Sequence, residues 1–310
     1  MIVLRSADLL VRLDPRHGAE ILDLVDLRSG RQLLGRPPFG SREPLAGDLC
    51  EEAWTQTYRG GWQLLAPNAG NACLVRGTWH GFHGRASSDP WTVLEVSEGA
   101  AALTWRGHGL EIKRRLALEE GTLAVSVRMQ ATDDSVPVVA AEHVSLGLEL
   151  IEPEVAIDLP GGRAFELNES EGPADPPSEA PSWPEVLLLD GSVERADRWP
   201  IAKVRSRYFA VTALPEGRAT IRNPVRGVGL ELAWESAWLE HVWIWHEVRT
   251  YGGPWRGQAE ILVVEPASVP HGLGLATAIE HGQARLLAAG ESLDYRLVAR
   301  PLVSMEAAGG

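Results

Sequence analysis

Cysteine is scarce in this chain of 310 residues, which contains only Cys50 and Cys73. Two cysteines cannot form the set of bridges that stabilises small secreted domains, and these two lack the paired spacing of a zinc site. Hydrophobic residues make up 45% and charged residues 23% of the chain, which is ordinary for a protein that buries a large core. We therefore expect a fold that needs no disulfides, in a reducing and cytoplasmic location.

The sequence also lacks a long apolar run and an excess of basic residues. In the N-terminal segment MIVLRSADLLVRLDPRHG, Arg5 and Asp8 interrupt the apolar stretch, so the segment predicts neither a signal peptide nor a membrane span. The formal net charge of -13 opposes binding to phosphate backbones and to anionic membrane surfaces. We expect no nucleic-acid partner and no membrane partner.

Phe and Tyr are scarce too, with four residues each, whereas Trp occurs twelve times. Trp offers a broad apolar face and one N–H donor, which suits stacking on the C–H face of a sugar ring. Large aromatic side chains are mostly buried for packing, so we expect most of the twelve in the core. The candidates for an aromatic floor under a ligand are Trp62, Trp91, Trp243, Trp245 and Trp255.

Helical periodicity with capping residues is missing over more than a turn or two. Instead, short apolar runs with period-two alternation recur between Gly, Pro, Asp and Asn residues, as in residues 101–132. Similar runs are VVAAEHVSLGLEL, YFAVTAL, GVGLELAW, HVWIWHEV, AEILVVEP and LDYRLVAR. This pattern predicts an all-β fold of antiparallel sheets with few short helices, and it favours a large sandwich over a barrel.

Two segments fall outside the strand pattern. Residues 169–184 (ESEGPADPPSEAPSWP) are rich in proline and acidic residues, so we expect a surface excursion or a lid there. Residues 305–310 are expected to form a flexible tail. The sequence contains no internal repeat.

Polar and aromatic residues gather in four stretches, at 60–70, 79–91, 140–147 and 241–268. The second contains HGFHG, but no third ligand follows His80 and His83 at a recognisable spacing, so we expect no metal site. Its glycines predict a backbone that turns sharply or approaches another group closely.

His143 and Glu265 are the titratable residues of most interest. His143 lies within an apolar strand pattern, where a histidine is most often a core residue with a hydrogen-bond partner. Glu265 follows the apolar run ILVV and precedes a proline, which places a carboxylate at the end of a buried strand. Buried carboxylates are rare unless they are paired or functional, so Glu265 is the more informative of the two.

Six motifs occur along the chain in a fixed order: GAEILDLVDLRSGRQLL, GGWQLLAPNAG, HGFHGRASSDPW, EHVSLG, VVEPAS and LLAAGESLDYRL. Together they cover about residues 15–300. In this order they resemble the aldose 1-epimerase, or galactose mutarotase, family, particularly its divergent bacterial branch.

The resemblance implies a single β-supersandwich domain over residues 1–304, with the sugar site on an open sheet face. In that family a histidine on a central strand protonates the ring oxygen, and a glutamate near the C-terminal end removes the proton of the anomeric hydroxyl. His143 matches the histidine and Glu265 the glutamate. The family's earlier sugar-binding histidine falls on His80 or His83, and Arg85 lies beside them.

The sequence departs from the better-studied members, whose central strand reads Thr-Asn-His-x-Tyr-Phe-Asn where this chain has Ala-Glu-His-Val-Ser-Leu from 141 to 146. Their asparagine–arginine pair is missing, and Arg59 is a loose substitute. Glu142 is expected to point away from His143 because successive strand residues face opposite ways. The further substrate-binding candidates are Trp62, Asn68, Trp243 and Trp245.

The expected function is an aldose 1-epimerase that interconverts the α and β anomers of an aldohexose with no cofactor. Two alternatives stay open. A hexose-6-phosphate 1-epimerase would need a cationic pocket, which Arg59, Arg76 and Arg85 could supply. A non-catalytic sugar-binding protein would keep the fold without turnover. The expected partner is a small-molecule sugar, and a homodimer is left open.

Overall fold

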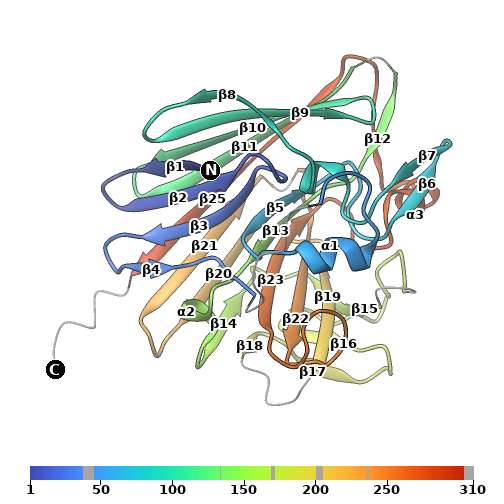
Figure 1. Cartoon of the computed structure of the whole chain (residues 1–310). Helices are drawn as coiled ribbons and strands as arrows, with labels where there is room; N and C mark the ends of the chain where they lie inside the picture. The colour runs from blue at the N-terminus through green and yellow to red at the C-terminus, as the bar shows by residue number, and fades with distance from the viewer. Residues whose placement is uncertain (38–44, 133, 169–171, 200–204, 236, 304–310) are drawn as a thin grey trace.

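The computed structural model describes residues 1–37, 45–132, 134–168, 172–199, 205–235 and 237–303. Two β-sheets dominate it (Figure 1). The larger has twelve strands, in the order β1 (Ile2–Arg5), β2 (Leu9–Asp14), β3 (Glu20–Asp26), β5 (Trp62–Leu65), β13 (Ala141–Ser145), β23 (Glu260–Ala267), β22 (His241–Val248), β19 (Arg205–Thr212), β15 (Arg163–Leu167), β16 (Glu185–Leu187) and β17 (Val193–Arg195), with β4 (Arg31–Gln32) paired to β3.

The second sheet has nine strands, in the order β18 (Arg198–Trp199), β14 (Val155–Asp158), β20 (Arg218–Asn223), β21 (Val228–Trp234), β25 (Ser292–Val303), β11 (Thr122–Ala131), β10 (Leu110–Glu119), β9 (Ala100–Gly107) and β8 (Thr92–Val96). Two small sheets pair β12 (Val136–Val138) with β24 (Arg285–Leu287) and β6 (Cys73–Val75) with β7 (Thr78–His80). The helices of the described residues are short: α1 (Glu51–Thr57), α2 (Leu148–Ile151), α3 (Leu275–Glu280) and the 3-10 turn η1 (Arg85–Ser87).

The main core lies between the two sheets. Leu13 and Val144 of the larger sheet belong to the same buried cluster as Ile112 and Leu297 of the second sheet. This is the sandwich that the period-two pattern predicted, and the expectation of an all-β fold with few short helices is confirmed.

A second apolar cluster covers the opposite face of the larger sheet. It includes Trp54 of α1, Ala141 of β13, Trp243 of β22 and Val263 of β23. The central strands are therefore buried on both faces, which explains why the run from 261 to 264 is apolar without alternation.

Three expectations about the periphery have different outcomes. Cys50 and Cys73 are both free. The expected loop at 169–184 contains bends and turns from residue 172 onward, whereas residues 169–171 lie outside the described residues. The expected tail at 305–310 also lies outside them, and the single domain over 1–304 stays a prediction.

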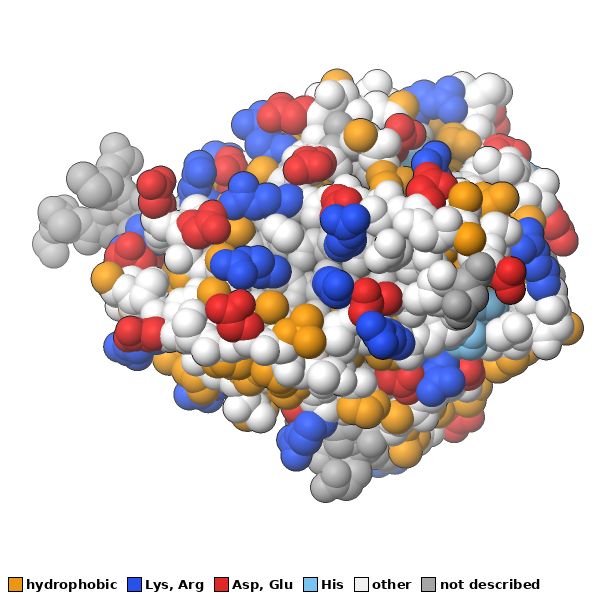
Figure 2. Space-filling view, turned by 90° about the horizontal axis from the view of Figure 1, so that it is seen from above, with side chains coloured by type: hydrophobic (Ala, Val, Ile, Leu, Met, Phe, Trp, Pro, Cys, Tyr) orange, Lys and Arg blue, Asp and Glu red, His pale blue; other side chains and the backbone are white. Residues whose placement is uncertain are grey.

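The surface shown in Figure 2 carries basic and acidic side chains interspersed with one another. Pairs of opposite charge are common on exposed strands, for example Lys113 with Glu111 and Arg296 with Glu119. None of the helices in the described part of the chain has the length and apolarity needed to span a membrane.

Candidate active site

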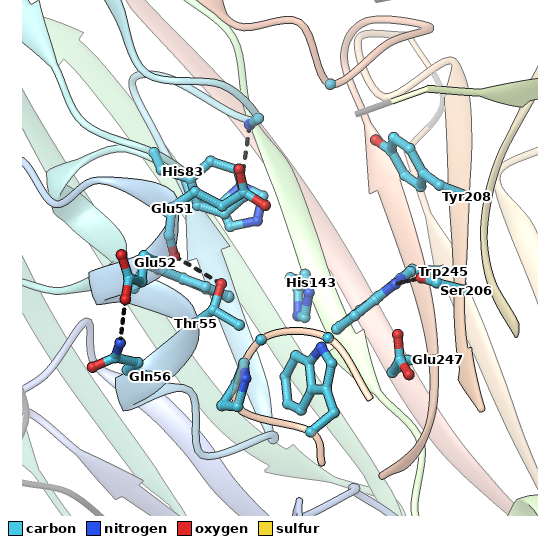
Figure 3. Close-up of a pocket in the computed structure, with 18 of the residues that line it drawn as sticks. Glu51, Glu52, Thr55, Gln56, His83, His143, Ser206, Tyr208, Trp245 and Glu247 are labelled. Carbon is cyan, nitrogen blue, oxygen red and sulfur yellow. Dashed lines mark hydrogen bonds between the residues drawn. The ribbon is translucent and has the colours of Figure 1, made fainter. Parts of the chain in front are cut away.

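A pocket of about 600 Å³ opens on the face of the larger sheet that the second apolar cluster covers (Figure 3). Strands β13, β22 and β23 form its floor, and helix α1 and the segment 250–256 form walls. Its lining includes both expected catalytic residues, His143 and Glu265.

Strand register brings His143 and Glu265 together. Strands β13 and β23 are antiparallel, with Ala141 opposite Ala267 and Val144 opposite Val264, so His143 faces Glu265 across the pair. His143 Nε2 lies 3.9 Å from Glu265 Oε1, and the two residues are 2% and 3% exposed. Neither His143 Nδ1 nor Glu265 Oε2 has a hydrogen-bond partner among the described residues. Buried polar atoms without partners are rare in folded proteins, and a catalytic role is one of the explanations for them.

Burial also sets the protonation of this pair. It lowers the pKa of His143 to about 3, because a buried imidazolium loses its hydration. It raises the pKa of Glu265 well above its ordinary value for the corresponding reason. Burial therefore favours the neutral imidazole and the protonated carboxyl group in this pair.

Strand β22 supplies the aromatic part of the pocket floor. Trp243, Trp245 and Glu247 alternate along it and all line the pocket, whereas Ile244 and His246 are buried on the other face. The expectation that Trp243 and Trp245 share a ligand-facing side is consistent with this placement. The Trp243 indole N–H donates to the Val269 carbonyl at 2.9 Å, and the rings of Trp245 and His143 have centroids 6.3 Å apart.

Helix α1 forms the facing wall. Glu51 and Glu52 lie in its first turn, where carboxylates interact favourably with the partial positive charge of a helix N-terminus. Trp54 and Thr55 on its inner side line the pocket. The Trp54 ring meets the His143 ring edge-on, with centroids 5.8 Å apart. This helix has under two turns, too few for periodicity to reveal it.

The structure places His83, and not His80, in the pocket. His83 Nδ1 accepts a hydrogen bond from the Gly70 backbone N–H at 3.1 Å. Burial and the nearby His143 lower the pKa of His83 well below its usual value. A neutral ring that accepts at Nδ1 carries its proton on Nε2, so His83 can donate to a ligand oxygen.

The loop around His83 depends on the glycines of HGFHG. Gly84 has φ of 70°, and a Cβ there would lie 2.4 Å from the Ala66 carbonyl oxygen. The predicted close approach is therefore confirmed, although the group approached is the backbone of a neighbouring loop. His80 lies outside the pocket lining: its ring stacks on His108 with centroids 4.5 Å apart.

Several expected binding residues are not pocket-lining residues. Trp62 is fully buried in the main core, where its indole N–H donates to Glu142 Oε2 at 2.6 Å. Trp62 pairs with Val144, so it faces the core side of the sheet. Asn68 is buried too, and its side chain holds loop backbone at Asn71 and Gly81. Trp91 donates to the carbonyl of Ala86.

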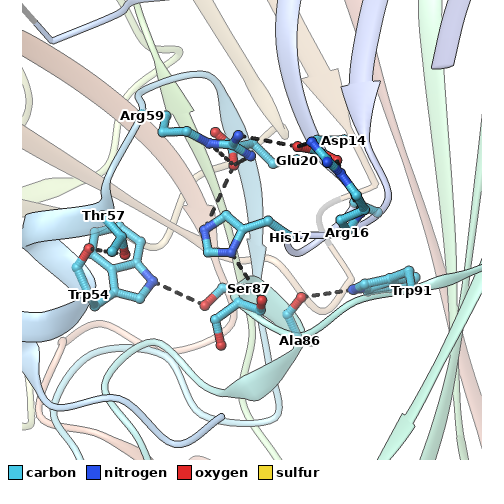
Figure 4. A network of polar contacts seen from close by, with 12 residues as sticks. Asp14, Arg16, His17, Glu20, Trp54, Thr57, Arg59, Ala86, Ser87 and Trp91 are labelled. Carbon is cyan, nitrogen blue, oxygen red and sulfur yellow. Dashed lines mark hydrogen bonds and ion pairs between the residues drawn. The ribbon is translucent and has the colours of Figure 1, made fainter. Parts of the chain in front are cut away.

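The three arginines are also engaged elsewhere. Arg59 donates to Glu20 at 2.8 Å and to Asp14 at 3.2 Å, in the buried network of Figure 4. Burial raises the pKa of Glu20 to about 7, and Arg59 opposes that rise. Arg59 lies between α1 and β5 and does not line the pocket. It contributes to the pocket only by helping to fix the position of α1.

Arg85 and Arg76 lie outside the pocket lining as well. Arg85 Nε donates to Asp89 at 2.9 Å, and Arg76 donates to the Ser135 carbonyl at 3.2 Å on the exposed hairpin of β6 and β7. Within the described residues, no group of three or more His, Cys, Asp or Glu side chains is arranged to hold a metal ion.

Sequence reasoning missed several lining residues. Extending the alternation of Trp243 and Trp245 by one step would have identified Glu247. Trp54, Thr55 and Tyr208 had no such signal, because α1 and β19 meet the site only through long-range packing.

No model of a known protein family matches the sequence, and no curated protein matches it. Solved structures, however, superpose on nearly the whole chain. One of these structures is described as galactose mutarotase-like, and the antiparallel β-sandwich of this chain shares its fold, so the fold expected from the sequence is confirmed.

Three of these structures illustrate the likeness. The Slr1438 protein from Synechocystis sp. PCC 6803 has a TM-score of 0.68 at 15% identity, and the match covers 98% of this chain and 96% of that chain. A galactose mutarotase-like protein from Lactobacillus casei has a TM-score of 0.62 at 16% identity, with 97% and 99% covered. Galactose 1-epimerase from Lactobacillus acidophilus has a TM-score of 0.63 at 12% identity, with 97% and 93% covered. Identities this low show a shared fold, and they leave the activity to be argued from the site.

Proposed function

We propose that this pocket interconverts the α and β anomers of an unphosphorylated aldose, the reaction of an aldose 1-epimerase. The observation that carries the proposal is the pairing of His143 with Glu265 at 3.9 Å on the pocket floor. The fold supports it, since one protein of similar structure is named galactose 1-epimerase.

The reaction needs one acid and one base at the same carbon. The ring opens when a base takes the proton of the C1 hydroxyl and an acid protonates the ring oxygen; the C1–C2 bond then rotates and the ring closes with the roles reversed. His143 is the proposed acid and Glu265 the proposed base. No metal or cofactor takes part in this scheme.

The pair carries the right number of protons for these roles. Burial raises the pKa of the Glu265 carboxyl group and lowers the pKa of His143, which favours the state with the transferable proton on Glu265. Moving that proton to His143 produces the carboxylate and the imidazolium without changing the net charge.

The charges around the pocket favour an unphosphorylated sugar. Glu51, Glu52 and Glu247 line it together with Glu265, and Arg256 is the basic residue among the described lining residues. A phosphate would meet carboxylates in place of the arginine cluster that phosphates require. The hexose-6-phosphate alternative therefore loses its expected cations, Arg59, Arg76 and Arg85. A small-molecule sugar as partner and a cytoplasmic location belong to this proposal.

Saturation-transfer NMR tests the proposal directly. Irradiating the α-anomer proton of glucose or galactose should reduce the β-anomer signal in the presence of the protein, at a rate above that of buffer alone. Glucose 6-phosphate serves as the comparison and should exchange more slowly. If the protein binds aldoses but accelerates exchange of none, the fold serves sugar binding without turnover.

A further inference from the structure

We infer that the pocket contains a second sugar-binding position, next to the catalytic pair along β22, and that the substrate is the reducing end of an oligosaccharide. The inference rests on the proposed function for its reaction, but the second position can be tested by binding alone.

The first argument is the length of the ligand-facing row on β22. In register, Trp243 lies opposite Glu265, Trp245 opposite Val263 and Glu247 opposite Ile261. The four residue steps from Trp243 to Glu247 span about 13 Å along the strand. A pyranose ring is built from bonds of about 1.5 Å and measures roughly 6 Å between oxygens on opposite sides. One ring over His143 and Glu265 therefore leaves the Glu247 end of the row uncovered.

The second argument is the shape of the space. The pocket holds about 600 Å³, within the range of roughly 300–1,000 Å³ of pockets that bury a drug-sized ligand. Figure 3 shows Trp245, Ser206 and Glu247 together on one side of it, with His143 toward the middle. Ser206 pairs with Glu247 in register across β19 and β22, so two polar side chains meet at this end.

The third argument is the state of Glu247. It is only 2% exposed. Its Oε1 accepts hydrogen bonds from the backbone N–H and the hydroxyl group of Thr250, at 3.0 and 2.5 Å. Among the described residues it forms no ion pair, and its Oε2 accepts no hydrogen bond. A carboxylate held in a fixed orientation with one oxygen free toward a pocket is a strong acceptor for a ligand hydroxyl group.

These features together fit a second neutral sugar. The Trp245 ring is partly exposed in the pocket and its indole N–H lies 3.4 Å from Ser206 Oγ, so its face can pack against the junction of two rings. The Glu247 carboxylate accepts from a hydroxyl group of the second ring. The carboxylates of the pocket disfavour an acidic sugar at the same position.

The experiment compares a monosaccharide with a reducing disaccharide. Binding of glucose and of cellobiose, maltose and lactose is measured by calorimetry on the wild type, and anomer exchange is measured on the same sugars by NMR. We expect at least one disaccharide to bind about tenfold or more tightly than glucose, since it gains a hydrogen bond to a charged group and added stacking.

Glu247→Gln identifies the position responsible. Glutamine keeps a carbonyl oxygen for Thr250 but loses the charged acceptor, so the disaccharide should lose about tenfold more affinity than glucose does. Thr250→Val, which removes the hydroxyl hydrogen bond to Oε1 and keeps the one from the backbone N–H, should act in the same direction. Glu240→Gln is the matched control, because Glu240 is exposed just before β22 and does not line the pocket.

Three outcomes decide the matter. Equal binding of glucose and every disaccharide overturns the inference, and so does a Glu247→Gln variant that weakens both sugars equally. Stronger binding of a glucose alkylated at O4 than of any disaccharide also overturns it, because the far end would then hold an apolar group. If the disaccharide preference is present but no sugar exchanges anomers, the proposed function fails and the second position stands.

Discussion

Glu142 and His143 are neighbours in the chain, but they lie on opposite faces of β13. On the core face, Glu142 accepts hydrogen bonds from Trp62 at 2.6 Å, Tyr295 at 2.9 Å and Arg114 at 3.0 Å. On the pocket face, His143 and Glu265 each keep a buried polar atom without a partner among the described residues.

The difference separates stability from function. A buried carboxylate with three hydrogen-bond donors is typical of a structural role, since the hydrogen bonds offset the cost of its desolvation. The buried polar atoms of His143 and Glu265 that lack partners cost stability, and titratable groups whose pKa values are perturbed in this way are concentrated at functional sites. Changes on the pocket face should therefore affect turnover, and changes on the core face should affect unfolding.

Glu265→Gln should have the largest effect. The amide keeps the size of the side chain but cannot accept the anomeric proton, so anomer exchange should fall about a hundredfold to ten-thousandfold. Sugar affinity should change far less, because the lost interaction acts mainly in the transition state. NMR exchange and calorimetry on the same preparation measure both quantities.

His143→Asn provides the companion variant, and it should show the same loss of exchange with retained binding. Exchange at the wild-type rate in both variants would remove the catalytic assignment and leave the pocket as a binding site.

Glu142→Leu should have the largest effect on stability. It leaves the guanidinium group of Arg114 buried without its carboxylate, at 0% side-chain exposure, which costs about 3–5 kcal/mol of unfolding free energy. Urea unfolding measures the loss. The double variant Glu142→Leu, Arg114→Met should recover most of it, because no unpaired charge remains. A double variant as unstable as the single one would show that the ion pair is not the cause.

The acid dependence of stability should distinguish His143 from its surroundings. The folded protein holds the pKa of His143 at about 3, below its ordinary value of 6.5, so the unfolded chain binds the proton first as pH falls. The stability contributed by neutral His143 is complete above pH 6.5 and is lost as pH falls toward 3, at up to about 1.4 kcal/mol per pH unit.

His143→Asn lacks this loss, so its unfolding free energy should decline less steeply over the same range. Since both proteins share every other titrating group, the difference between the two curves isolates this residue. Parallel curves would mean that His143 is solvated in the folded protein.

Tyr295→Phe should have the smallest effect. It removes one of the three donors to Glu142 and leaves the ring in the core, so the unfolding free energy should fall by about 1 kcal/mol. Anomer exchange per folded molecule should stay at the wild-type level. A loss of exchange without a loss of stability would show that the core face also tunes the pocket.

Local alternation explains which parts of the site could be predicted. The run from Trp243 to Glu247 shows its ligand-facing residues in its own sequence, because side chains alternate along a strand. The same rule placed Glu142 opposite to His143, as the structure shows. Trp62 was assigned to the ligand because it lies in a motif rich in polar residues, but motif membership does not tell which face a residue occupies.

The residues Arg59, Arg85 and Asn68 were misplaced for a related reason. Each has the right chemistry for a sugar, yet each is already bound within the protein: Arg59 to Glu20, Arg85 to Asp89 one helical turn away, and Asn68 to the backbone of Leu275. A sequence shows the donors available, whereas their partners depend on packing.

The sequence by itself determined the strands, the all-β class and the identity of the paired residues His143 and Glu265, because alternation and motif order are properties of the chain. Only the tertiary structure decided that His83 enters the pocket while His80 stacks on His108, and that α1 closes one wall. When a strand is buried on both of its faces, its sequence is apolar on both, so the sequence does not show which face borders a pocket. The segment that covers each face determines which side becomes a pocket, and that segment is brought there by contacts between distant parts of the chain.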